Sequence, residues 1–295
     1  MFLNKNQGVC LMNHFLYKVK HFGQFFLLSL KIPFKIDVHI VEHCNLNCKG
    51  CSHFSSVAQP EFLNPKEYEK ALLHLSRIEK SIGQIQLIGG EPLLHSQLPL
   101  LIRLTRSYLP QTKINILSNG ILFVNEEELR KKEDFIDACK TNDVLIKITK
   151  YPGINYDAVE DNLRKADIKF YFFADKGLSN SWGKFPLYKD GFKHISNHLK
   201  FLKLTRCDSF NCLQLVGTKI YPCCHAAYIR HLNNYFNLNF ELKKEDAVDI
   251  TKIKRSFPIR KLLFMSTPFC KYCGNGYEKS KWAKSEKNME EWMAD

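Results

Sequence analysis

Three cysteines lie close together near the start of the chain, and their spacing suits a metal centre. Cys44, Cys48 and Cys51 are separated by three and then by two residues. Iron–sulfur clusters usually take four cysteine ligands, and a structural zinc ion takes four closed ligands. A triplet on one loop therefore indicates an open iron–sulfur site, in which one iron is left for a substrate or a cofactor.

A second stretch with chemical potential follows the apolar run at 85–88. It consists of Gly89, Gly90, Glu91 and Pro92. Glycines let backbone groups approach a ligand closely. Glu91 is either a ligand contact or the carboxylate that begins a helix, and the sequence leaves both alternatives open.

Together these two stretches resemble the radical S-adenosylmethionine (SAM) enzymes, whose hallmark is Cys-x3-Cys-x2-Cys after a first strand and a glycine-rich SAM-binding turn after a second. The resemblance implies that Cys44, Cys48 and Cys51 bind a [4Fe–4S] cluster, with SAM chelating its fourth iron. An electron from the cluster then releases a 5′-deoxyadenosyl radical, which abstracts hydrogen from the substrate. An electron donor such as flavodoxin or ferredoxin is implied as well. Gly50 departs from the family, which often carries an aromatic residue before the third cysteine.

The same resemblance assigns residues to SAM binding after three successive strands, although Ser or Thr at a strand end also serves local turns. No catalytic acid or base can be chosen from the sequence. The residues assigned to SAM are Gly89, Gly90, Glu91, Pro92, Ser118, Asn119 and Thr149.

Six further cysteines follow residue 200, and they resemble the twitch extension, a shortened SPASM domain. In that pattern a hairpin and a later Cys-x2-Cys turn hold an auxiliary [4Fe–4S] cluster. Cys207 is an alternative to the first ligand and Cys224 to the second, and a structural zinc ion on the same thiolates is the other interpretation. The four ligands that the resemblance implies are Cys212, Cys223, Cys270 and Cys273.

Strand and helix patterns alternate between these motifs. Apolar alternation and caps predict strands at 35–41, 85–88, 113–117, 144–148 and 168–173, and helices at about 65–78, 98–108, 126–139 and 157–166. This alternation predicts an α/β fold with a parallel sheet, curled into a partial (β/α)6-type barrel. Active sites in such folds lie at the carboxyl ends of the strands, where the candidate residues fall.

Three segments are expected along the chain. Residues 1–34 read as a basic amphipathic helical segment, with peripheral membrane contact as the minority interpretation. Its apolar run is shorter than the ~20 residues of a membrane helix, and no signal-peptide cleavage site follows. Residues 35–195 would form the radical SAM core. Residues 196–295 would form the auxiliary extension, which begins with a β-hairpin at 213–224.

Composition limits the class of protein. The 295 residues are 45% hydrophobic and 25% charged, which is typical of a globular protein, and the net charge is +13. Grouped cysteines without a secretory signal favour metal ligation in the cytoplasm. The lysines are spread along the chain, so the charge favours an anionic small substrate or a membrane surface over nucleic acid.

Two hypotheses for function remain. In the first, a radical SAM enzyme acts on a sugar or polysaccharide precursor or on a peptide; the surroundings of Cys51 resemble members found in polysaccharide contexts, and peptide-modifying enzymes share the architecture. In the second, the chain is a zinc-stabilised basic binding protein without catalysis. The Gly-Gly-Glu-Pro turn and the strand–helix alternation favour the enzyme, because a zinc module needs neither.

Overall fold

The computed structural model describes residues 34–79, 82–177, 182–184, 186–191, 207, 212–274 and 278–294, which belong to one compact unit. The predicted amphipathic segment, apart from residue 34, lies outside these ranges, and so does the boundary expected at 195. No helix of the described ranges is both long enough and apolar enough to cross a membrane.

An eight-stranded, mainly parallel sheet forms the framework, with the strand order β10-β9-β8-β1-β2-β3-β4-β5. The five predicted strands are present and pair in parallel, in sequence order. They confirm the predicted α/β fold with a parallel sheet. Their bounds are β1 Lys35–Val41, β2 Gln84–Gly89, β3 Lys113–Ser118, β4 Val144–Lys150 and β5 Phe170–Asp175.

The predicted hairpin is present, but it belongs to the main sheet. Strand β8 (Leu213–Val216) pairs in parallel with β1, and β9 (Lys219–Tyr221) pairs antiparallel with β8. Strand β10 (Val248–Asp249) then pairs antiparallel with β9. Because Ile36 lies opposite Leu213 in this register, the apolar side chains of β8 continue the apolar face of β1. The sixth parallel strand therefore comes from the C-terminal part of the chain.

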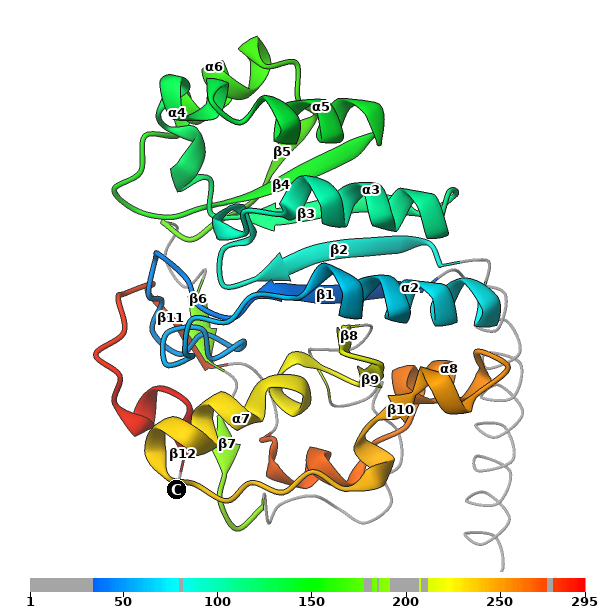
Figure 1. Cartoon of the computed structure of the whole chain (residues 1–295). Coiled ribbons are helices and arrows are strands. Elements are labelled where there is room, and N and C mark those ends of the chain that lie inside the picture. The colour runs from blue at the N-terminus through cyan, green and yellow to red at the C-terminus, as the bar shows by residue number, and fades with distance from the viewer. Residues whose placement is uncertain are drawn as a thin grey trace, which may run out of the picture. The chain divides into compact units, whose positions relative to one another are not determined.

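Helices cover the apolar face of the sheet (Figure 1). Asn64 caps α2 by accepting from the N–H of Lys66, and proline occupies the first turn. Helix α3 packs on β3 and α5 packs on β4. The helices are α2 Pro65–Ile78, α3 Leu98–Tyr108, α4 Glu126–Arg130, α5 Glu133–Thr141 and α6 Tyr156–Lys165.

One predicted helix is divided into two. The stretch expected as a single helix at 126–139 breaks between α4 and α5, where Lys132 has non-helical backbone angles. Leu129 and Phe135 are both buried. Residues six apart lie about 120° from each other around a continuous helix, so the break lets both side chains turn further toward the core.

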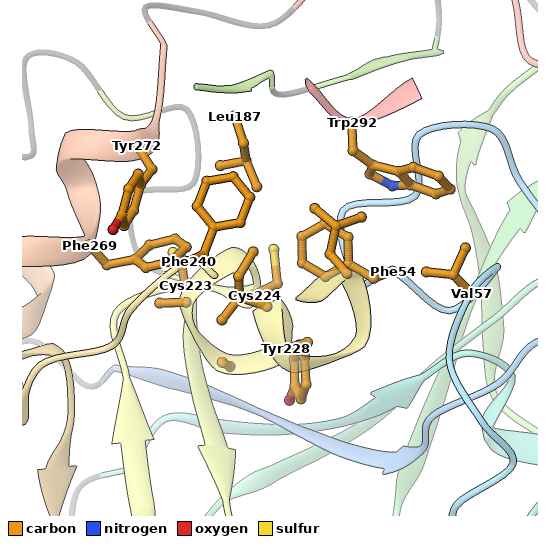
Figure 2. Close-up of a cluster of buried hydrophobic side chains, with 14 residues drawn as sticks. Phe54, Val57, Leu187, Cys223, Cys224, Tyr228, Phe240, Phe269, Tyr272 and Trp292 are labelled. Atoms are coloured by element: carbon orange, nitrogen blue, oxygen red, sulfur yellow. The ribbon is translucent and has the colours of Figure 1, made fainter. Parts of the chain in front are cut away.

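The C-terminal part of the chain adds helices α7 (Cys224–Phe236) and α8 (Phe257–Phe264) and two small sheets. In the small sheets β11 (Glu278–Ser280) pairs with β6 (Trp182–Lys184), and β12 (Met293–Ala294) pairs with β7 (Leu187–Tyr188). A second hydrophobic cluster joins α7 to the segments around it (Figure 2). Because Phe54 and Val57 belong to it, this cluster also anchors the loop that follows β1.

Candidate active site

The cysteine triplet lies on the loop that leaves the carboxyl end of β1. Cys48 is buried, and Cys44 and Cys51 are half-buried. Gly50 has φ +60°, in the left-handed region that favours glycine. Its N–H donates to the Glu291 carboxylate at 3.3 Å. A glycine stands here in place of the expected aromatic residue because the backbone adopts a left-handed conformation in which its N–H reaches Glu291.

The glycine pair after β2 packs directly against this loop. A Cβ atom built on Gly90 would lie 1.7 Å from the carbonyl oxygen of His43, and one on Gly89 would lie 2.2 Å from that of Val41. The Gly90 N–H donates to the Val41 carbonyl at 2.7 Å, and the Glu91 N–H donates to that of His43 at 3.2 Å. The glycines thus allow two chain segments to meet, in addition to any approach to a ligand.

Glu91 joins the second strand end to the third. Its fully buried carboxylate accepts from the Leu93 N–H at 3.1 Å, the Ser118 hydroxyl at 2.8 Å and the Asn119 N–H at 2.9 Å. Burial raises its pKa to about 7, although these three donors lower it. Of the two alternatives for Glu91, the contact with Leu93 matches the helix-start carboxylate, since Glu91 caps a short 3-10 turn at Pro92–Leu94.

Tyr156 joins the third and fourth strand ends, and sequence reasoning missed it. Its hydroxyl lies 2.9 Å from the Asn119 carbonyl oxygen and 3.1 Å from that of Thr149, and it accepts from the Tyr151 N–H at 2.9 Å. Its one sequence signal is its position at the start of a helix after a strand, which is too common to indicate this role.

These loops enclose a cavity of about 250 Å³. Eight of the residues that the sequence assigned to the cluster or to SAM line this cavity. They come from the loops that follow β1, β2 and β3 and from the end of β4. Glu91 and Pro92 do not line it and lie behind its wall. The candidate residues in the lining are Cys44, Cys48, Cys51, Gly89, Gly90, Ser118, Asn119 and Thr149.

A C-terminal clamp, residues 282–292, closes the cysteine loop from the outside. The Lys49 N–H donates to the Ala283 carbonyl at 2.9 Å, and the Ser285 N–H donates to that of Asn47 at 2.8 Å. The Glu291 carboxylate, which accepts from Gly50, also accepts from the Ser285 hydroxyl at 2.6 Å. In Figure 1 this red segment passes beside the blue loop after β1. No motif predicted this contact, because its two halves are remote in sequence.

Two buried donors near the thiols have no hydrogen-bond partner among the described residues: the indole N–H of Trp282 and the hydroxyl of Ser55. The first faces Cys48 and the second faces Cys51. Burial raises the pKa of the Cys44 thiol to about 12, so a bound metal would be needed to hold it as thiolate. Iron–sulfur clusters carry sulfur acceptors for such donors, so the residues present fit that group.

A buried acid connects β1 to α7. The Glu42 carboxylate lies 2.9 Å from His39 Nδ1 and 2.6 Å from His231 Nε2. Burial would raise the pKa of Glu42, but the charge of His39 and the hydrogen bonds from both histidines lower it overall. This ion network fixes the C-terminal helix against the strand that carries the cysteine loop.

The C-terminal cysteines are partly gathered. Cys223 belongs to the same hydrophobic cluster as Phe269, which precedes the predicted Cys-x2-Cys turn, and Tyr272, which lies within it (Figure 2). Cys273 packs against this cluster. The Cys224 thiol lies within hydrogen-bond distance of the Cys212 thiol. Within the described ranges, no three His, Cys, Asp or Glu side chains converge to hold a single metal ion.

Comparisons with known proteins identify the domain. Residues 38–167 match the Radical SAM superfamily. The chain is 28% identical over 141 residues to a probable GTP 3′,8-cyclase of Pyrococcus abyssi, covering 46% of this chain and 44% of that one. It is 28% identical over 102 residues to a 7,8-dihydro-6-hydroxymethylpterin dimethyltransferase of Methanocaldococcus jannaschii, covering 33% of this chain and 19% of that one.

One solved structure shares the fold over most of the chain. The crystal structure of BtrN with AdoMet and 2-DOIA has a TM-score of 0.51 and 19% identity, covering 83% of this chain and 94% of that one. The matched region spans under half the length of the curated relatives. The matched residues hold the triplet, the glycine pair and the Ser118–Asn119 turn on successive strand ends. Over residues 38–167 the chain therefore carries a Radical SAM superfamily domain.

Proposed function

We propose that Cys44, Cys48 and Cys51 hold a [4Fe–4S] cluster and that SAM occupies the adjoining cavity. The observation that carries this proposal is that the three thiols share one cavity with the glycine pair, Ser118, Asn119 and Thr149. When bound, the cluster would supply the electron that cleaves SAM to the 5′-deoxyadenosyl radical, which abstracts hydrogen from the substrate. The electron would come from a donor such as flavodoxin or ferredoxin.

The chain's own residues would position SAM and exclude water. Backbone groups of Gly89 and Gly90 would face its amino group, and Ser118, Asn119 and Thr149 would bind its polar atoms. Glu91 and Tyr156 would act as positioning residues, because their hydrogen bonds fix Asn119 and Thr149. Pro92 would shape the turn behind the cavity wall. The substrate would be a sugar or polysaccharide precursor, or a peptide.

We propose in addition that the C-terminal cysteines hold an auxiliary cluster. The ligands would be Cys212, Cys223, Cys270 and Cys273. The hydrophobic cluster that contains Cys223, Phe269 and Tyr272, with Cys273 packed against it, supports this set because it brings the hairpin and the later turn together. The contact between Cys212 and Cys224 keeps Cys224 as the alternative to Cys223. Cluster thiolates bind different iron atoms, so they do not need to converge on one point.

Anaerobic reconstitution followed by iron, sulfide and 5′-deoxyadenosine analysis tests the function. With both clusters loaded, we expect about eight irons per chain and SAM cleavage under strong reductant. The variant with Cys44, Cys48 and Cys51 all changed to Ala should fold, lose half of its iron and form no 5′-deoxyadenosine. Cys139→Ala, which changes a buried cysteine outside both sets, is the matched control. SAM cleavage by the triple variant would refute the assignment.

Cys270→Ala combined with Cys273→Ala tests the auxiliary cluster separately. Because metal binding energy is partly folding energy, this variant should lose one cluster and melt at a lower temperature. Uncoupled SAM cleavage should persist, while turnover of the substrate should fall. About four irons with one zinc in the unmodified protein would instead favour a structural zinc ion. Unchanged iron and melting temperature would remove the C-terminal site.

A further inference from the structure

The face of the sheet opposite helices α2 to α6 carries many polar side chains. We call it the inner face. Its residues alternate along the strands with the apolar residues of the helix-covered face. Parallel sheets that are covered on both sides are usually apolar on both faces. Because buried polar groups need partners, the polar side chains of this face must contact either other parts of the protein or a ligand. The inner face also carries apolar residues such as Ile88, Leu117 and Leu145. Its polar residues are Lys35, Asp37, His39, Gln84, Gln86, Asn115, Lys147 and Gln214.

Beneath β1 and β8 the protein itself supplies partners for Asp37 and Gln214 of the inner face. The Asp37 carboxylate accepts from Gln86, Gln214 and Lys35, each at 3.2 Å. Tyr228 of α7 packs over this region and donates to the Gln214 side-chain oxygen at 3.3 Å. The charge of Asp37 is neutralised by Lys35, so this half of the inner face is a closed internal network.

Beneath β4 and β5 the inner face reaches solvent, whereas Asn115 of β3 is buried. Lys147 is half-buried, and its ammonium lies 3.1 Å from the side-chain oxygen of Asn115 in the orientation that satisfies that amide. Across the described ranges, no carboxylate lies within ion-pairing distance of this ammonium. Burial, followed by repulsion from Lys35, lowers its pKa, although attraction to Asp37 opposes this shift. Within the part of the chain that the structure describes, Lys147 is therefore a half-buried cation whose contact is a neutral amide and whose nearest opposing charge, Asp37, makes no ion pair with it.

Aromatic surface lies next to this cation. Phe173 and Tyr171 of β5 are 56% and 40% exposed. The Lys147 ammonium lies 6.0 Å from the centroid of the Phe173 ring. Large apolar side chains that remain exposed on an otherwise polar concave face offer a flat surface for a ring.

The open half of the inner face is continuous with the cavity of the cysteines. Lys147 precedes Thr149 by two residues, and Asn115 precedes Leu117 by two, which is a separation of about 7 Å along a strand. Thr149, Leu117 and Phe173 all line that cavity. A molecule bound at Lys147 would therefore extend toward the position proposed for SAM.

We propose that the substrate is a small anionic metabolite whose negative group binds Lys147 and whose ring packs on Phe173. This inference rests on the proposed function, and it chooses between the substrate classes left open there. A peptide added along the edge strand β5 is the competing occupant. Strand addition uses main-chain hydrogen bonds and would bring no negative charge to Lys147.

Calorimetric titration of the reconstituted, SAM-bound full chain tests the proposal, with inorganic phosphate, acetate and glycerol as probes. Phosphate or acetate should bind and glycerol should not, and the tighter anion identifies the group. Loss of one charge-assisted contact should weaken anion binding about tenfold or more in Lys147→Met. Lys147→Arg should retain binding. Lys70→Met, which removes an exposed lysine on α2, should leave it unchanged.

A stability measurement separates a binding role from a structural one. Since Lys147 is a partly buried cation that forms no ion pair with any described residue, Lys147→Met should unfold at the same urea concentration as the unmodified chain, or at a higher one. Equal anion affinity in Lys147→Met, no anion binding in the unmodified chain, or a loss that Lys147→Arg does not restore would overturn the proposal. Failure of the proposed function would appear separately, as absence of 5′-deoxyadenosine without any added anion.

Discussion

The indole N–H of Trp292 donates to the carbonyl oxygen of Cys51 at 2.9 Å. Trp292 is 2% exposed and packs in the same hydrophobic cluster as Phe54 of the cysteine loop. The third cysteine of the triplet is therefore held by a residue 241 positions later in the chain. The integrity of the candidate cluster site depends on both ends of the described structure.

Trp292→Phe should destabilise the metal-free protein. The change keeps an aromatic ring in the core but leaves the Cys51 carbonyl without its donor, at a cost of about 1–3 kcal/mol. Urea unfolding measures this loss as a lower midpoint with an unchanged slope. An unchanged midpoint would mean that the clamp does not close on the loop in solution.

Trp282→Phe should leave the stability of the metal-free protein unchanged and alter the reduction potential of the reconstituted protein. Its N–H has no partner among the described residues, so the metal-free protein should unfold at the same midpoint as the unmodified chain. In the reconstituted protein, loss of a donor to a cluster sulfur should lower the reduction potential. Spectroscopic redox titration measures the potential, with Trp292→Phe as the matched substitution. An unaltered potential would contradict a hydrogen bond from Trp282 to the cluster.

Gly90→Ala should prevent the site from forming. The added methyl group would lie 1.7 Å from the carbonyl oxygen of His43, and backbone on both sides cannot yield without displacing the cysteine loop. A loss of more than about 4 kcal/mol, or failure to fold, is expected. At Gly153 an added methyl group meets nothing within 4 Å, although φ is +84°, so Gly153→Ala should cost only about 1 kcal/mol. Similar midpoints for the two variants would disprove the close contact.

Tyr156→Phe should loosen the wall of the cavity without emptying the core. Loss of the hydroxyl leaves the Tyr151 N–H and the neighbouring carbonyls without a common partner, so SAM affinity and stability should both fall, stability by about 1–3 kcal/mol. Tyr108→Phe removes a hydroxyl that donates to Glu69 at the surface and is the control. Equal SAM affinity in both variants would exclude a positioning role for Tyr156.

Glu91→Gln should change the pH dependence of stability. The pKa of Glu91 is raised to about 7 from 4.5, so the folded chain holds the extra proton between these values. Its contribution to stability is therefore complete below pH 4.5 and is lost as pH rises through about 7, by roughly 3 kcal/mol in all. Urea unfolding of metal-free protein at pH 5 and pH 8 should show this difference against Glu91→Gln. The exposed Glu127→Gln variant should follow the unmodified chain. Parallel pH profiles for the unmodified chain and Glu91→Gln would contradict the shift.

Local sequence patterns predicted most of the helices and parallel strands, because the start of a helix and the alternation of a strand depend on residues that are close in sequence. Asn64 and Pro65 mark the start of α2, and alternation marks β1 and β4 closely. The cysteine triplet and Thr149 could be placed at one rim because carboxyl ends of parallel strands meet there. Long-range features could not be predicted in this way. The pairing of β8 with β1 and the contact of Gly50 with Glu291 join residues that no local period relates.

The clamp also sets an order on the maturation of the protein. During synthesis Cys51 leaves the ribosome long before Ala283, Glu291 and Trp292 exist, and the chain must grow by 241 residues before Trp292 can close on it. Until then the thiols lie on a loop without its outer cover. Iron–sulfur assembly proteins would therefore have access to the nascent triplet, while completion of the C-terminal segment would seal the centre against water and oxygen. If the triplet holds a cluster as proposed, its insertion would be linked to the final folding step.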